Sequence, residues 1–163
     1  MWTRYVVLVG CVLVISAFVG CRSDPVAGVS TPDQLTLYSI NGLVPVRGKV
    51  PEGEDEFHGF PVLGKVEITD AAKRKEIMAA LKEGVTRSDG NMAKCFWPRH
   101  AIRAVEKGRT VDYVICFKCY QLEVHEGSTM NLKPVTREPQ LVFNKLLNEA
   151  GISLTPSTDS ESE

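Results

Sequence analysis

The sequence of 163 residues lacks an excess of charge of either sign, because 19 Lys and Arg residues stand against 20 Asp and Glu residues. A nucleic-acid-binding surface needs a concentration of basic residues, so this balance argues against nucleic acid as a partner. The chain also lacks a Gly-rich phosphate loop, a His-x-x-x-His pair, a Ser-His-Asp order and any internal repeat. These absences remove the motifs that identify nucleotide-binding enzymes, zinc proteases and serine hydrolases, and we expect no cofactor.

One long uncharged stretch stands at the start of the chain. Arg4 is the only charged side chain before it, and residues 5–20 then carry no charge until Arg22 follows. A basic start, an apolar run of about 15 residues and small residues at its end are typical of an export signal. The run is shorter than the roughly 20 residues that span a bilayer. A retained transmembrane anchor and an ordinary cleaved signal without lipid both stay open as alternatives.

The end of this run, Phe18-Val19-Gly20-Cys21, resembles the lipobox of bacterial lipoproteins. In that family the signal is cut just before the Cys, whose thiol and new amino group receive fatty acyl chains such as palmitate. The resemblance implies a lipoprotein-type signal peptide in residues 1–20, lipidation at Cys21 and a membrane-anchored protein of the cell envelope that faces the periplasm. Phe18 stands where Leu, Val or Ile is usual, and Arg22 after the Cys favours the outer membrane.

The remaining residues predict one domain between two polar ends. Residues 21–33 are rich in Ser, Asp, Pro and Gly and predict a flexible tether. Residues 155–163 are rich in Ser, Thr and acid and predict a disordered acidic tail. Residues 34–154 are then a single domain of ordinary size.

Alternation of apolar and polar residues predicts strands at 35–40, 60–68, 92–105 and 110–124, with a further strand at 130–135. Ile77, Leu81 and Val85 repeat every fourth position after a capping Thr69 or Asp70, which indicates a helix. A second apolar stripe begins at Pro139 and ends before Gly151, which indicates another helix. The order predicts an α+β fold, an antiparallel sheet of about four to five strands with two helices packed on one face.

Four residues near the centre of the chain have the side chains of a chemical site, namely Cys95, His100, Cys116 and Cys119. They could ligate zinc, but Cys116 and Cys119 would point to opposite faces of a strand. A thiol redox centre like that of thioredoxin has such a pair at a helix N-terminus, and this run is β-like. A hairpin turning at residues 107–108 favours a Cys95–Cys119 disulfide with Cys116 as a buried thiol. Three buried free thiols are the remaining alternative.

The other candidate contact lies beside Pro98, which interrupts strand pairing. Arg99 and His100 together could bind an anionic group, since His gains a proton near neutral pH. The alternative is that His100 is hydrogen-bonded to the backbone. His58 and His125 are interpreted as loop and strand-end residues.

Two segments, Cys-Phe-x-Pro-Arg-His and Val-Ile-Cys-Phe-x-Cys, resemble those of a set of short uncharacterised bacterial exported proteins and lipoproteins. The resemblance covers roughly residues 69–154, implies a recurring domain and implies no activity. Its carriers are Cys95, Phe96, Pro98, Arg99, His100, Val114, Ile115, Cys116, Phe117 and Cys119.

The sequence therefore predicts a lipid-anchored envelope protein with a small binding or scaffolding domain and no identifiable catalysis. Its partners are the membrane, through the lipid, and an unknown protein or small molecule. The alternative is a metal- or thiol-dependent envelope enzyme that uses Cys95, His100, Cys116 and Cys119.

Overall fold

A computed structural model describes residues 31–43, 50 and 53–155. The predicted signal peptide, Cys21, most of the predicted tether and residues 156–163 lie outside the described residues. No helix in the described ranges is long and apolar enough to cross a membrane. The elements in chain order are β1 (Gln34–Ile40), β2 (Glu56–Phe57), β3 (Phe60–Glu67), α1 (Ala71–Thr86), β4 (His100–Glu106), β5 (Arg109–Cys116), β6 (Gln121–Glu126), β7 (Thr129–Pro134) and α2 (Pro139–Glu149).

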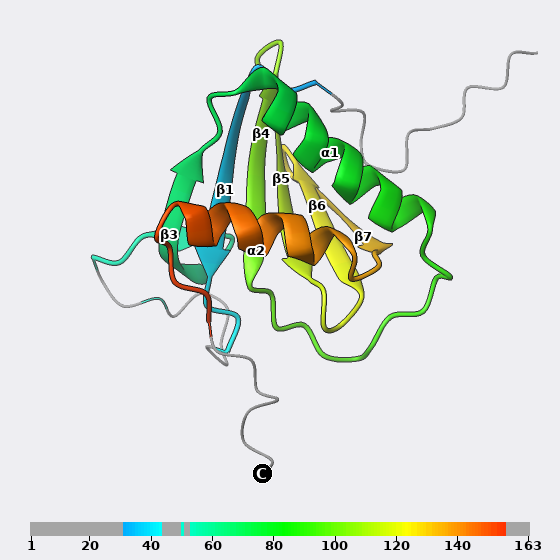
Figure 1. Ribbon diagram of the computed structural model, residues 1–163. Helices are drawn as coiled ribbons and strands as arrows, with labels where there is room; N and C mark the ends of the chain where they lie inside the picture. The colour runs from blue at the N-terminus through cyan, green and yellow to red at the C-terminus, as the bar shows by residue number, and fades with distance from the viewer. Residues whose placement is uncertain (1–30, 44–49, 51–52, 156–163) are drawn as a thin grey trace, which may run out of the picture.

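The strands form one antiparallel sheet in the order β2-β3-β1-β4-β5-β6-β7, curled into a half-barrel (Figure 1). Strand β1 lies between β3 and β4, because α1 carries the chain from β3 past β1 before β4 begins. From β4 onward each strand pairs with the next along the chain. The second half of the sheet is therefore a meander built from short turns.

The predicted sheet of four to five strands is wrong, because the fold is mostly β and the sheet has seven strands. Residues 110–124, predicted as one strand, are divided into β5 and β6 by a turn at residues 117–120, where Tyr120 has φ of 55°. Strand β2 has only two residues and lies at the end of a polar segment that has no strand pattern. Two residues are too few to show an alternation, and a turn made of ordinary β-forming residues gives no breaker signal.

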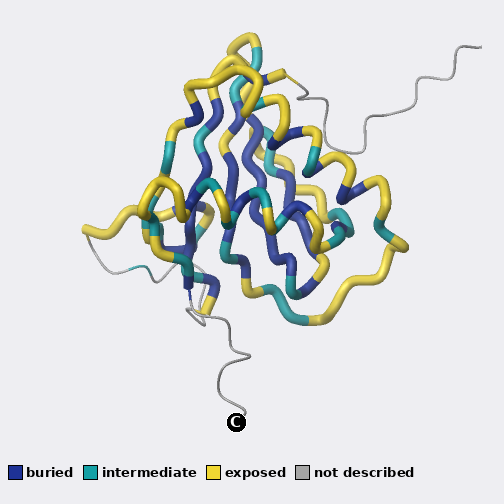
Figure 2. The backbone as a smooth tube through the Cα atoms, viewed as in Figure 1, coloured by how far each residue is buried: buried dark blue, intermediate teal, exposed yellow. Residues whose placement is uncertain are grey.

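Both helices lie across the same face of the sheet, and neither helix covers the other face (Figure 1). In Figure 2 the strands behind the helices are buried, whereas the outward sides of both helices are exposed. Asp70 caps α1, since its Oδ1 accepts a 2.8 Å hydrogen bond from the Lys73 amide. The main core lies between helices and sheet and includes Leu35, Leu37, Ile77, Leu81, Ile102, Tyr113, Ile115, Leu122, Phe143 and Leu147.

A close approach holds the two helices together at Gly84. A Cβ atom at this position would lie 2.7 Å from Pro139 Cγ and 3.2 Å from a Val135 methyl group. A larger side chain would therefore collide with Pro139 at this position. Glycine inside a helix normally costs stability, and here the close contact between the helices explains its presence. The contact fixes the start of α2 against the end of α1.

A smaller apolar cluster lies apart from the main core. It contains Tyr38, Ile40, Phe57, Phe60, Ala101 and Val114. Phe57 and Phe60 form the pair that closes the β2–β3 hairpin, and the Phe57 ring lies 4.5 Å from that of Tyr38. The hairpin therefore covers part of the sheet face that the helices leave uncovered.

The ends of the described chain are joined to the domain by hydrogen bonds. The Asp33 amide donates to the Val105 carbonyl at 2.7 Å, and the Asp33 carboxylate accepts from the Lys107 amide. Thr155 is buried, and its hydroxyl donates to the Ile40 carbonyl at 2.9 Å. Ordered contacts thus reach Asp33 in the predicted tether and Thr155 in the predicted tail.

Candidate functional site

The sheet face opposite the helices carries a connected set of polar side chains, which we call the histidine cluster: His58, Arg103, Asp112, Glu123 and His125. They come from the β2–β3 turn and from β4, β5 and β6. Register explains why the sheet residues meet, since Arg103 pairs with Asp112 and Asp112 pairs with His125 across neighbouring strands. Side chains opposite one another on adjacent strands share a face.

The β2–β3 turn brings His58 to this face. His58 and Gly59 have φ of 50° and 82°, as in the two-residue turns that match the twist of a hairpin. His is one of the few residue types other than Gly that adopt a positive φ with some frequency, so it suits this turn position. His58 Nε2 lies 2.8 Å from Asp112 Oδ2, and this contact joins the hairpin tip to the middle of the sheet.

Asp112 is the centre of the cluster. Arg103 donates two hydrogen bonds to its carboxylate, at 2.8 and 2.7 Å, in the bidentate geometry that Arg and carboxylates prefer. Burial raises the pKa of Asp112, but the hydrogen bonds from Arg103 and His58 outweigh it and leave that pKa below its usual range. Asp112 is therefore a stable anion that holds both partners in place.

The two imidazole rings stack on each other. The ring centroids of His58 and His125 are 3.9 Å apart with an interplanar angle of 25°, and His125 Nε2 lies 3.1 Å from Glu123 Oε2. Each ring is thus oriented by its own carboxylate. Imidazole side chains can transfer protons in enzymes. Here the Nε2 atom of each ring already contacts a carboxylate, which favours a structural role for both rings.

Strand β7 forms the margin of the sheet next to the histidine cluster. Its Met130 pairs with His125 and its Leu132 pairs with Glu123, so these side chains share the face of the cluster. Both are large apolar side chains with about half of their surface in solvent, 50% for Met130 and 46% for Leu132. Within the described part of the chain β7 pairs only with β6, so its outer edge has no strand beside it.

The turn before β7 decides which amides point outward. Residues 127–128 form a two-residue turn, so Glu126 and Thr129 are the hydrogen-bonded pair that flanks it. Bonded and non-bonded pairs alternate along an antiparallel ladder. The N–H and C=O groups of Met130 and Leu132 therefore point away from β6, along the free edge.

The opposite margin of the sheet is protected differently. Strand β2 has two residues, and the exposed positions of β3 include the charged Lys65 and Glu67. Short strands and charges are the usual means of preventing edge-to-edge pairing. Strand β7 has six residues with Lys133 as its one charge, so it is the more available edge.

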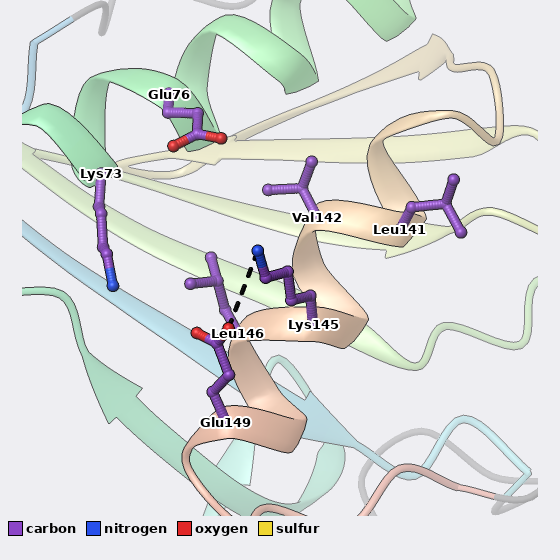
Figure 3. Close-up of a pocket in the computed structure, with 7 residues that line it drawn as sticks. All are labelled: Lys73, Glu76, Leu141, Val142, Lys145, Leu146 and Glu149. Carbon is purple, nitrogen blue, oxygen red and sulfur yellow. Dashed lines mark ion pairs between the residues drawn. The ribbon is translucent and has the colours of Figure 1, made fainter.

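A groove of about 320 Å³ lies between α1 and α2 on the other side of the molecule (Figure 3). Its charged lining is balanced, with Lys73 and Glu76 from α1 and Lys145 and Glu149 from α2. Lys145 Nζ lies 3.9 Å from Glu149 Oε1 on the same helix, and the dashed line in Figure 3 marks this ion pair. Exposed ion pairs of this kind contribute little energy, and the balanced lining gives no chemical reason for a ligand in the groove.

The structure brings the three predicted Cys residues together but pairs them differently from the prediction. Cys116 and Cys119 form the disulfide, with Cα atoms 5.2 Å apart, and Cys95 is a thiol whose Sγ lies 3.0 Å from Cys119 Sγ. The expectation that Cys116 and Cys119 point apart assumed a continuous strand. Strand β5 ends at Cys116, and the turn that follows brings Cys119 back beside it.

Arg99 and His100 are used inside the domain. The Arg99 guanidinium donates to the Thr155 carbonyl. His100 is 1% exposed on the helix-covered face, with Nε2 2.7 Å from Asn144 Oδ1. The two side chains thus have protein partners, and the anion contact predicted for them stays a prediction. The described residues contain no cluster of three or more His, Cys, Asp or Glu side chains placed to hold a metal ion.

Sequence reasoning missed the histidine cluster because its members are far apart in the chain. His58 and Asp112 are 54 positions apart. One signal was present, since Asp112 is a lone charge in the otherwise apolar run of residues 111–117. A buried carboxylate needs a partner, so its presence there indicates a polar site on that face.

Comparison of the chain with protein-family models, with curated proteins and with solved structures gives no match. The resemblance to exported bacterial proteins therefore stays a prediction.

Proposed function

We propose that this chain is a lipid-anchored protein of the bacterial cell envelope whose domain binds an extended segment of a partner protein along β7. The anchor rests on the signal and lipobox pattern that ends at Cys21. The binding mode rests on one observation, the free β7 edge with Met130 and Leu132 exposed beside it. An extended backbone is the group that matches such an edge.

The chemistry of the edge identifies the kind of partner. The outward N–H and C=O groups of Met130 and Leu132 can form main-chain hydrogen bonds with one added strand. Their side chains offer apolar surface to alternate residues of that strand. The histidine cluster holds the neighbouring face rigid, so less freedom is lost when a partner binds.

The catalytic alternative has less support. His100 lies on the helix-covered face, hydrogen-bonded to Asn144, and burial lowers its pKa to about 4. It is therefore a neutral core residue at physiological pH and a poor base for Cys119. The metal alternative lacks a ligand cluster among the residues that the structure describes.

The edge is tested with a photoreactive amino acid at Met130 in the full chain, expressed in bacteria. We expect a crosslinked adduct with one partner protein. Leu132→Pro should reduce the yield of this adduct by roughly tenfold or more, because proline removes the outward N–H of residue 132. The same change leaves the β6–β7 hydrogen bonds intact, since this N–H does not point toward β6. Leu132→Lys, which keeps the backbone intact and adds a charge, should also reduce the yield. Mass spectrometry of the adduct reports the yield and the partner.

The matched control is the same photoreactive residue at Leu63 on β3, whose exposed fraction is 45%. It should give no adduct that depends on Leu132. An adduct of twice the chain mass would show that the edge pairs with a second copy and would overturn the partner proposal. Absence of an adduct at Met130, or one unaffected by both Leu132 variants, would overturn it as well.

A further inference from the structure

We propose that Cys95, Cys116 and Cys119 form an internal thiol–disulfide exchange centre, in which Cys95 gives external thiols access to the buried bridge. This site is separate from the β7 edge and does not depend on the proposed binding function. The centre has two states. One has the Cys116–Cys119 disulfide of the structure, and the other has the Cys95–Cys119 disulfide that the sequence favours.

The geometry places a nucleophile against its target. Cys95 Sγ lies 3.0 Å from Cys119 Sγ, within the separation of about 3–3.5 Å at which reacting atoms are held for attack. Cys119 and Cys116 are 0% and 1% exposed, whereas Cys95 is only half-buried. The bridge is thus shielded from solvent, and among the described cysteines Cys95 is the free thiol, which lies against the bridge and is partly exposed.

Hydrogen bonds outside the disulfide hold the three residues together. The Ala93 amide donates to the Cys119 carbonyl at 2.9 Å, and the Gln121 side-chain amide donates to the Cys95 carbonyl at 3.0 Å. The Cys119 amide lies 3.2 Å from the Cys116 carbonyl and closes the turn. The arrangement therefore does not require the Cys116–Cys119 bond, and we expect it to persist after exchange.

The exchange step is balanced without an oxidant or a reductant. The Cys95 thiol loses its proton, and the thiolate attacks Cys119 Sγ. A Cys95–Cys119 bond forms as the Cys116–Cys119 bond breaks, and Cys116 leaves as a thiolate that takes up a proton. One disulfide and one thiol are present before and after the step, so it runs in either direction.

Exchange makes the centre reactive toward the outside. In the Cys95–Cys119 state a disulfide sulfur is half-buried, so a small thiol can attack Cys95 and release the Cys119 thiolate. The product is a mixed disulfide at Cys95, and a second thiol completes the reduction. An exported protein meets thiols and disulfides of this kind in its compartment.

The test compares the full chain with its Cys95→Ser variant, both oxidised and folded in detergent. Reduced glutathione is added, samples are quenched in acid, and alkylation with peptide mapping follows Cys116 and Cys119. We expect Cys95→Ser to slow reduction of the bridge by roughly tenfold or more, because direct attack then requires local opening of a buried region. Equal rates in the two proteins would overturn the proposal.

Two further measurements keep the proposal testable if Cys95→Ser folds poorly. Alkylation of Cys95 in the folded wild-type chain should slow reduction to a similar extent. Cys116→Ser leaves Cys95 and Cys119 as the only pair in the centre, and we expect them to form a disulfide under oxidised glutathione. Two free thiols in Cys116→Ser under that condition would show that Cys95 cannot reach Cys119, and would overturn the exchange.

Discussion

Acidification is expected to reduce the free energy of unfolding by about 3 kcal/mol through His100 alone. Burial lowers the pKa of this imidazole from 6.5 to about 4, with a smaller contribution from Arg99 and an opposing one from the hydrogen bond with Asn144. Between these two pKa values the unfolded chain binds a proton that the folded domain does not. This loss of stability is absent well above pH 6.5 and grows as the pH falls from 6.5 to about 4.

The measurement is urea unfolding across this pH range for the wild type and for His100→Gln, which cannot gain the proton and keeps an amide near Asn144. Other titrating groups act in both proteins, so the difference between the two pH slopes isolates His100. The low pKa of Asp112 places its own loss of stability at more acidic pH. Identical slopes would mean that His100 is protonated in the folded domain or solvated there.

Removal of the Cys21 thiol is expected to abolish lipidation completely. In Cys21→Ser no sulfur remains at the position where the lipobox resemblance places the acyl chain, so a fatty-acid probe should label the wild type alone. Cys11→Ser is the matched control, because Cys11 lies inside the predicted signal and should leave labelling unchanged. Equal labelling of Cys21→Ser and the wild type would contradict the proposal that the protein is a lipoprotein. Stable anchoring needs more than one acyl chain, which this resemblance implies.

Helix positions could be predicted from the sequence because their signals are local. Asp70 is the cap of α1, Pro139 is the first residue of α2, and Gly151 follows α2 with φ of 69°. Each signal acts within one turn of helix. The sheet depends on pairings between distant residues, such as Tyr38 with Ala101, and these leave no trace in either segment alone. The strand number failed for that reason.

The candidate site divides in the same way. The Cys residues could be identified as a group, but their pairing depended on whether residues 110–124 form one strand or two. The histidine cluster needed the register of β4, β5 and β6 and the position of the β2–β3 turn. The free edge of β7 could not be recognised at all, because an edge is defined by what the rest of the sheet places beside a strand.

The free edge of β7 is tested most directly by residue-resolved amide hydrogen exchange on the purified full chain. We predict that the Met130 and Leu132 amides exchange within roughly tenfold of an unstructured chain, because they point outward from the sheet. The Asn131 and Lys133 amides, which pair with Val124 and Leu122, should be strongly protected. Protection of Met130 and Leu132 equal to that of Asn131 and Lys133 would contradict the proposed binding edge, since it would mean that the edge is already paired.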